Sequence, residues 1–255
     1  MNLQLNFSLA KGYKSNSQIA RVVTERWVEE NSFCPRCGNS RLNRYGNNKP
    51  VADFFCNNCK SEYELKSKKD AFILKIVNGA YDMMIKRINS ETNPHFFFLN
   101  YSSNTLQVQN FLVIPNYYFT NDIIERRSPL SQNARRAGWV GCNILLQSIP
   151  TYGRIFLVKE KTIETKTRVL MNWSQTSFLA EQEMEKRGWT IEIMKLVDKI
   201  NKKTFELKEV YAFENILKEK FPRNRFIKDK IRQQLQILRD KEIIEFIGNG
   251  IYRRV

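Results

Sequence analysis

Four of the five cysteines stand in two pairs of equal spacing. Cys34 and Cys37 form one Cys-x2-Cys pair, and 18 residues separate it from a second pair, Cys56 and Cys59. Each pair can turn two sulfurs to one side, and two such turns can close a tetrahedron around zinc. Because four thiolates leave no open position on the metal, we predict a structural Zn²⁺ site rather than a catalytic one. A thiol redox pair and reduced core cysteines are the alternatives, and the fifth cysteine, Cys142, is interpreted as a small buried hydrophobic residue.

Two carboxylates and a lysine flank the second cysteine pair. Asp53 lies just before this pair, and Glu64 and Lys66 follow it closely. We predict strands at residues 51–55 and 62–66. Alternate residues of a strand share a face, so Glu64 and Lys66 should point the same way, and Asp53 on the neighbouring strand can face them. Two such carboxylates can bind Mg²⁺, and a lysine beside the metal can orient or help deprotonate an attacking water.

The spacing Asp53-x10-Glu64-x-Lys66 resembles the PD-(D/E)xK nuclease motif, although an ordinary charged hairpin face is the alternative from spacing alone. The usual Pro-Asp pair is absent, since Pro50 stands three residues before Asp53 and would mainly shape the beginning of the strand. Glu25, on a predicted helix, is a further candidate for the metal site that the spacing does not test. The chain has one histidine, so any nuclease chemistry must rest on carboxylates and lysine.

The charge of the chain indicates the class of partner. Lys and Arg total 42 against 26 acidic residues, a formal charge of +16, which favours a polyanion such as DNA. No apolar run approaches the roughly 20 residues of a membrane-spanning helix, and no signal peptide opens the chain. We therefore expect a soluble cytoplasmic protein that binds DNA rather than a membrane. A merely basic soluble protein is the alternative.

The elements that position these residues have a mixed pattern in the first part of the chain. Residues 17–30 predict an amphipathic helix with Ser15 or Ser17 as its N-cap, and residues 71–88 predict a second helix. Residues 95–101, 111–114 and 154–158 suit strands. The sequence thus predicts an α/β nuclease domain with a central sheet over residues 1–185. Residues 161–185 have few periodic apolar positions and are interpreted as the connection to a second domain.

The second predicted domain covers residues 186–255. Helices are expected at 189–200, 207–221 and 227–241, followed by short strands at 243–247 and 251–254 around a Gly-Asn-Gly turn. Three helices followed by a hairpin is the order of a winged helix-turn-helix domain.

Two segments carry side chains suited to reading DNA. The third of these helices has an outer face that can enter the major groove, and the hairpin adds candidate backbone contacts. These candidates are Lys230, Arg232, Gln233 and Gln236 on the helix and Tyr252, Arg253 and Arg254 on the wing. In the first domain, the loop at 131–139 offers Arg135, Arg136 and Trp139, and the indole could wedge against bases or cover a methyl group. A solvated helix face and a core tryptophan beside surface arginines are the alternatives.

Several longer segments together resemble a known family over nearly the whole chain. They are KSNSQ (14–18), CPRCG (34–38), PVADFFCNNC (50–59), ELKSKK (64–69), NPHFFFL (93–99), ARRAGWVGCNI (134–144), GRIFLV (153–158), RGWTIEI (187–193) and KIRQQLQILRDKEIIEF (230–246). The chain resembles the DpnI family of methyl-directed type II restriction endonucleases, which cut DNA when adenine in GATC is N6-methylated.

This resemblance implies a PD-(D/E)xK domain that hydrolyses phosphodiester bonds with Mg²⁺ at Asp53, Glu64 and Lys66, a structural zinc, and a winged helix that reads the same site. The expected partner is double-stranded DNA methylated on adenine, and no obligate protein partner is expected. A zinc-containing winged-helix regulator that binds DNA without cutting it is the alternative function. The three candidate catalytic residues discriminate between the two, because a regulator needs no metal-binding face.

Overall fold

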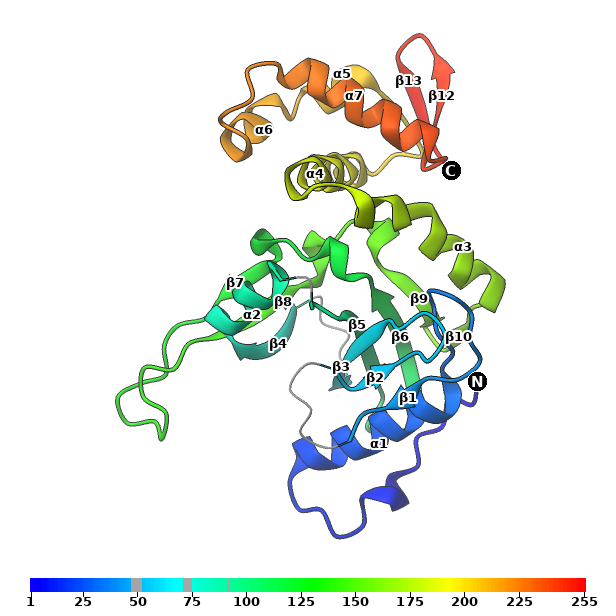
Figure 1. The fold of residues 1–255 in the computed structure, drawn as a ribbon, viewed down its shortest axis with the longest axis vertical. Helices are drawn as coiled ribbons and strands as arrows, with labels where there is room; N and C mark the ends of the chain where they lie inside the picture. Colours follow the sequence, from blue (N-terminus) through cyan, green and yellow to red (C-terminus); the bar gives the residue numbers. More distant parts are fainter. Residues whose placement is uncertain (47–51, 71–74, 91) are drawn as a thin grey trace. The chain divides into compact units, whose positions relative to one another are not determined.

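The computed structural model describes residues 1–46, 52–70, 75–90 and 92–255 (Figure 1). Its chain divides into two compact units, Met1–Ser174 and Gln175–Val255. Across the described residues, no helix has both the length and the apolar character needed to cross a membrane.

A seven-stranded mixed sheet forms the centre of the first unit. Its strand order is β1-β2-β3-β5-β6-β9-β10, in which β3 and β5 are parallel and the other neighbours are antiparallel. The strands are β1 (Asn43–Arg44), β2 (Phe54–Phe55), β3 (Glu62–Lys69), β5 (His95–Tyr101), β6 (Val108–Ile114), β9 (Ile155–Lys159) and β10 (Thr162–Ile163). Every residue of β5 is buried, as its continuous apolar run predicts for a central strand. The predicted α/β class with a central sheet is confirmed.

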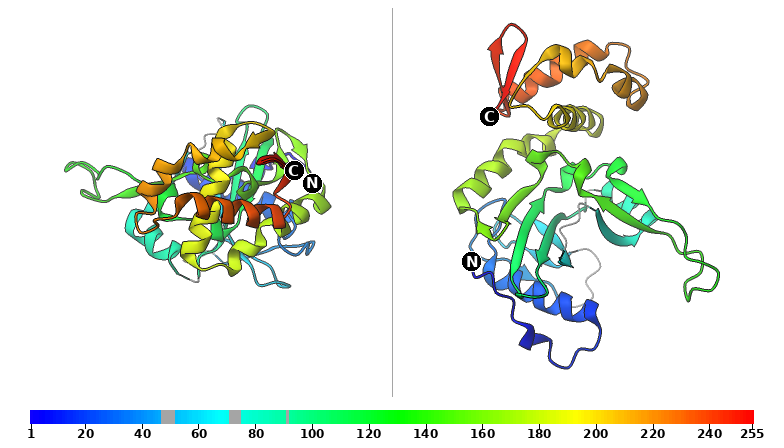
Figure 2. Two further views of the ribbon diagram at one scale, coloured as in Figure 1. Left: turned by 90° about the horizontal axis from the view of Figure 1, so that it is seen from above. Right: turned by 180° about the vertical axis from the view of Figure 1, so that it is seen from behind.

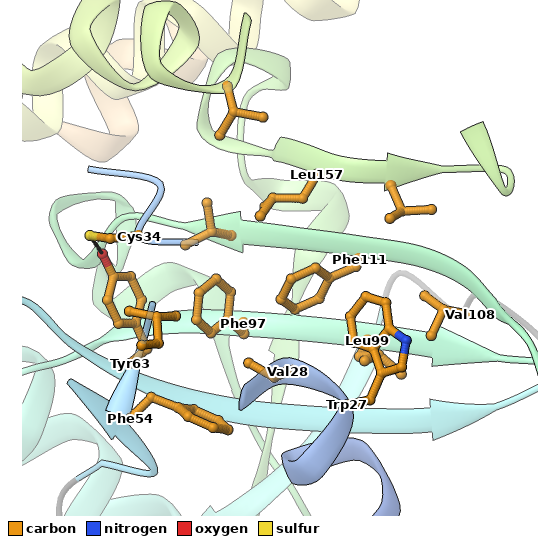
Figure 3. Close-up of a cluster of buried hydrophobic side chains, with 14 of the residues drawn as sticks. Trp27, Val28, Cys34, Phe54, Tyr63, Phe97, Leu99, Val108, Phe111 and Leu157 are labelled. Atoms are coloured by element: carbon orange, nitrogen blue, oxygen red, sulfur yellow. Dashed lines mark hydrogen bonds between the residues drawn. The ribbon is translucent and has the colours of Figure 1, made fainter. Parts of the chain in front are cut away.

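Helix α1 (Asn16–Asn31) covers one face of this sheet and confirms the predicted first helix. Ser15 is at its N-cap position, although its hydroxyl bonds to that of Ser17 rather than capping the helix. Trp27 packs edge-on against Phe111 with ring centroids 5.3 Å apart, and its indole N–H donates to the Asn2 carbonyl at 2.7 Å. Figure 3 shows Trp27 beside Leu99, Val108 and other core side chains of the strands. This core fixes the face of β3 that carries Tyr63 and Leu65.

A smaller antiparallel sheet of order β4-β8-β7 accompanies helix α2 (Tyr81–Ile88). Its strands are β4 (Lys75–Ala80), β7 (Ile124–Arg126) and β8 (Gly141–Leu145). The predicted helix at 71–88 is wrong over 75–80, which form β4, while residues 71–74 lie outside the described residues. The strand forms because Ile76 and its neighbours pair with β8, more than 60 residues away in the sequence, and such pairing overrides a local helical pattern. Between β7 and β8 the chain continues as a long arm that extends clear of the rest of this unit (Figures 1 and 2).

The predicted connection at 161–185 is also structured. It contains β10, helix α3 (Lys166–Thr176) and a 3-10 turn at Ser177–Glu181. Val169 and Trp173, four residues apart on α3, are buried in the core of the first unit. These two positions suffice to anchor a helix, although the segment as a whole looks polar. Further 3-10 turns lie at Phe7–Ala10, Asn116–Tyr118, Asn121–Ile123, Leu146–Ser148 and Thr151–Gly153.

The second unit has the expected order of a winged helix-turn-helix domain. It comprises α4 (Met184–Ile200), β11 (Thr204–Glu206), α5 (Leu207–Tyr211), α6 (Glu214–Lys220), α7 (Ile227–Asp240), β12 (Ile244–Gly248) and β13 (Ile251–Arg254). The predicted helix at 207–221 is two short helices, and β11 was not predicted. β11 joins the wing because Phe205 stacks on Tyr252 across the strand pair, with centroids 5.6 Å apart.

Candidate functional site

The four paired cysteines converge on one point. Their sulfurs all lie within 4.8 Å of one another, and the Cys34–Cys59 and Cys37–Cys56 sulfur pairs are each 3.6 Å apart. All are free thiols, since a disulfide would hold its sulfurs at about 2.05 Å. Zinc–sulfur bonds of about 2.3 Å in a tetrahedron place sulfurs about 3.8 Å apart, close to the observed spacing. The cluster therefore fits one tetrahedral zinc ion.

Both cysteine pairs use the same backbone turn. In the first, the Gly38 N–H donates to the Cys34 carbonyl at 2.8 Å; in the second, the Lys60 N–H donates to the Cys56 carbonyl at 3.0 Å. Both turn residues have positive φ, +76° for Gly38 and +60° for Lys60. Burial raises the pKa of the Cys34 thiol, so a bound cation is needed to hold that sulfur as a thiolate. The turns present sulfurs, not an open coordination position, which suits a structural metal.

The second turn joins β2 to β3 and so positions Asp53. β2 is only two residues long, so the Leu65 amide extends past it at the edge of β3. The Asp53 carboxylate accepts this N–H at 2.7 Å, and the Asp53 N–H donates to the Tyr63 carbonyl at 2.9 Å. Burial raises the pKa of Asp53, and the nearby carboxylates of Glu25 and Glu64 raise it further. The hydrogen bond from the Leu65 amide acts in the opposite direction and lowers it. A site with this excess of negative charge favours a cation.

Glu64 and Lys66 share a face of β3, as the alternation predicts. Tyr63 is buried on the α1 side of the sheet, whereas Glu64 and Lys66 line a cavity of about 540 Å³ next to α2. The Lys66 ammonium lies 2.5 Å from one oxygen of Glu64, and the guanidinium of Arg87 lies 2.6 Å from the other. Arg87 is on α2 and was not singled out from the sequence, because nothing local marks its contact with a strand 23 residues earlier.

Glu25 reaches the same region from α1. It is 5% exposed and pairs with Arg21 at 2.7 Å and with Arg44 at 3.5 Å. These three side chains line a small pocket together with Asp53. The charges of Glu25, Glu64 and Lys66 therefore all act on the pKa of Asp53.

The arm between β7 and β8 carries the predicted DNA-contacting loop. Arg135 and Arg136 are exposed, and Trp139 is half-buried, so it is not a core tryptophan. The Arg136 guanidinium lies 4.8 Å from the centre of the Trp139 ring, a cation–π arrangement that keeps the indole at the surface. Cys142, at the base of the arm in β8, is fully buried, as expected of a small hydrophobic residue.

On α7 the predicted outer face is at the surface. Arg232, Gln233 and Gln236 are exposed, and the partly exposed Lys230 donates to the Gln233 amide oxygen at 2.8 Å. Arg232 donates to the Tyr211 hydroxyl at 3.0 Å.

The three predicted wing contacts differ in their surroundings. Arg253 pairs with Glu245 at 2.5 Å, and Tyr252 packs among Phe205 and Phe246. Arg254 turns back toward α4, where it donates to the Val197 carbonyl. Arg253 is thus the wing candidate whose exposed ion pair can be exchanged for a phosphate.

Two family models match this chain. Residues 1–182 match the model of DpnI, described as the Dam-replacing family, and residues 185–254 match the model described as the Dam-replacing HTH domain. The first range holds the cysteine cluster and the Asp53, Glu64 and Lys66 region, and the second runs from the first turn of α4 to the end of β13.

Proposed function

The chain belongs to the DpnI Dam-replacing family, and on that premise we propose that it is a modification-dependent type II restriction endonuclease. Its substrate would be double-stranded DNA carrying N6-methyladenine in GATC, and its reaction Mg²⁺-dependent hydrolysis of a phosphodiester bond. The proposal assigns residues 1–185 to the nuclease domain and 186–255 to the winged helix. The observation that carries it is the acidic and basic cluster of Asp53, Glu64 and Lys66 around β3, next to a cysteine cluster that fits zinc.

Asp53 and Glu64 are the residues we assign to the metal. Both are carboxylates of the kind that Mg²⁺ prefers, and they lie on adjoining segments tied by the Asp53–Leu65 hydrogen bond. Mg²⁺, when bound, would polarise the phosphoryl oxygen and favour a hydroxide nucleophile. The raised pKa of Asp53 fits a site that gains stability when a cation arrives.

Lys66 is assigned to the attacking water. Its side chain is 24% exposed and its ammonium is close to Glu64, so it can hold a water by hydrogen bonding at the cavity face and stabilise negative charge developing on the phosphate. The zinc cluster acts at a distance from the chemistry. It closes the turn between β2 and β3 and so keeps the segments carrying Asp53 and Glu64 in register.

Methyl selectivity is assigned to both units. One buried methyl contributes about 0.8 kcal/mol, so one domain reading the two methyls of the palindrome gains about 1.6 kcal/mol, roughly fifteenfold. Two domains that each read both methyls reach about 3 kcal/mol, roughly two hundredfold. We propose that Trp139, with Arg135 and Arg136, reads in the nuclease domain. In the winged helix the proposed readers are Lys230, Arg232, Gln233 and Gln236. On the wing we propose Arg253 as the contact to the DNA backbone, since Tyr252 and Arg254 are engaged within the domain.

Single-turnover cleavage of a methylated duplex tests the catalytic assignment. Asp53→Ala, Glu64→Ala and Lys66→Ala should each abolish cleavage and leave methyl-selective binding intact. Glu62→Ala is the matched control, because Glu62 lies on the same strand and accepts a hydrogen bond from the Tyr45 hydroxyl instead. If the three variants still cut at the wild-type rate, the assignment is wrong. A zinc-containing regulator would bind methylated DNA and cut it under no condition.

A further inference from the structure

The carboxylate of Glu64 is held by two cations at once. One oxygen lies 2.5 Å from the Lys66 ammonium and the other 2.6 Å from the Arg87 guanidinium. Only 14% of the Glu64 side chain is exposed, so solvent does little to weaken these pairs. Because both oxygens are already paired with cations, a metal ion that binds Glu64 competes with these two for the carboxylate, and repulsion between the cations favours the departure of one of them.

Arg87 has donor capacity that the fold does not use. Its Nη1 pairs with Glu64, but its buried Nη2 has no hydrogen-bond partner among the described residues. A buried guanidinium nitrogen without an acceptor is costly, because it loses its hydration and gains nothing in return. A guanidinium is also a planar fork that matches the two oxygens of a phosphate or a carboxylate. The unused nitrogen therefore points to an anionic ligand.

The cavity beside Arg87 has room for such a ligand. Its volume of about 540 Å³ lies within the range of about 300–1,000 Å³ typical of ligand pockets. Glu64 and Lys66 line it from β3, Arg87 and Lys86 line it from the last turn of α2, and Ser90 lines it from just after this helix. Cations from two different elements thus face one space next to the proposed metal ligand.

We propose that Arg87 binds the phosphate of the bond to be cleaved, and that its ion pair with Glu64 is a resting arrangement that DNA and the metal replace. This inference rests on the proposed nuclease function. Arg87 is the cation that moves because it belongs to α2, whereas Lys66 follows Glu64 by two residues on the same strand. When Glu64 turns to a cation, the phosphate takes its place as the anionic partner of Arg87. The exchange frees the carboxylate and orients the substrate in one step.

A purely structural role for Arg87 makes a different prediction. If Arg87 only neutralises Glu64, then its removal should ease metal binding, lower the Mg²⁺ concentration needed for cleavage and leave DNA contacts unchanged. If it binds phosphate, then its removal should cost one DNA contact and much of the rate.

The test measures the affinity of the full-length zinc-loaded protein for a methylated GATC duplex in Ca²⁺ at several NaCl concentrations. Loss of one phosphate contact lowers the slope of log affinity against log salt by about 0.9. We expect this loss for Arg87→Met, together with a fall of about a hundredfold or more in single-turnover cleavage in Mg²⁺. Arg87→Lys keeps the charge but not the fork, so it should keep the salt slope and cut at least tenfold more slowly than wild type.

Lys86→Met is the matched control, since it removes one charge from the same helix and cavity. Its single-turnover cleavage rate should be at least tenfold higher than that of Arg87→Met. An unchanged slope with wild-type cleavage in Arg87→Met overturns the inference, and so does equal loss in the two methionine variants. If Arg87→Met does not fold, wild-type cleavage by Arg87→Lys overturns it equally. Failure of the wild type itself to cut methylated DNA would refute the proposed function instead, and the salt slopes would still decide whether Arg87 contacts phosphate.

Discussion

The two cysteine turns have the same backbone conformation, but the position with left-handed φ is a glycine in one and a lysine in the other. Adding a side chain at the first and removing one at the second should therefore change zinc affinity in opposite directions. Gly38 has φ +76°, and a Cβ there would lie 3.0 Å from Lys166 Cε and 3.1 Å from Leu170 Cδ1. Lys60 has φ +60° and carries a side chain in a conformation that disfavours one. A non-glycine residue in this region costs about 1–2 kcal/mol.

Gly38→Ala should therefore weaken zinc binding by about 1–2 kcal/mol, or roughly fivefold to thirtyfold, because the turn is formed when the metal is held. Lys60→Gly removes the same strain. It also raises the conformational entropy of the unfolded chain, which lowers the stability of the fold by about 0.4–1 kcal/mol. Its net effect should be a zinc affinity equal to the wild type or up to roughly fifteenfold higher. The lost contact of the Lys60 ammonium with the Asn57 carbonyl is at the surface and contributes little.

Competition against a chelator of known zinc affinity measures both effects in the full chain. Gly188→Ala is the control, because Gly188 is an ordinary helical glycine in α4 of the other unit with open space around it. The reasoning is refuted if Gly38→Ala binds zinc as tightly as the wild type, or if Lys60→Gly binds it more weakly.

Three further predictions follow from the same structure. Cys56→Ser should lower the zinc content, the stability and the cleavage rate together, as measured by elemental analysis, melting and DNA cutting; full activity without zinc would show that the cluster is dispensable. Burial lowers the pKa of His95 to about 3, so its neutral form is required by the fold and stability is lost as pH falls below the unfolded value of about 6.5. Between pH 7.5 and 5.5, the wild type should lose about 1.4 kcal/mol of unfolding free energy more than His95→Asn, in denaturant titrations; equal losses would mean that the fold does not lower the pKa of His95. Trp139→Ala should lower the preference for methylated over unmethylated GATC about fourfold or more in binding assays without changing the Mg²⁺ requirement; an unchanged preference would assign all methyl reading to the winged helix.

The features that the sequence predicted well are those set by short spacing. The two Cys-x2-Cys pairs specify a four-sulfur cluster, and the alternation of Glu64 and Lys66 along a strand places both on one face. The winged helix could be recognised from the order of its helices and its Gly-Asn-Gly turn. Each of these patterns is contained within a few turns or residues of chain.

What the sequence did not predict depends on distant partners. β4 is a strand because it pairs with β8, and its apolar residues alone resemble the start of α2. The pairing of Arg87 with Glu64 links α2 to β3, and no local spacing marks it. Likewise Glu25, which the sequence could only suggest, joins the pocket of Asp53 because α1 packs on the sheet through Trp27 and its neighbours.

The most direct test of the account uses plasmid DNA from an adenine-methylating host and from a non-methylating host. Each plasmid is incubated with Mg²⁺ and either the zinc-loaded wild type or Asp53→Ala. The account predicts that the wild type cuts methylated plasmid at GATC sites and leaves unmethylated plasmid intact, while Asp53→Ala binds the methylated plasmid and cuts neither. Equal cutting of both plasmids would contradict the assigned methyl reading. Binding to methylated DNA with no cutting by the wild type would contradict the nuclease assignment itself.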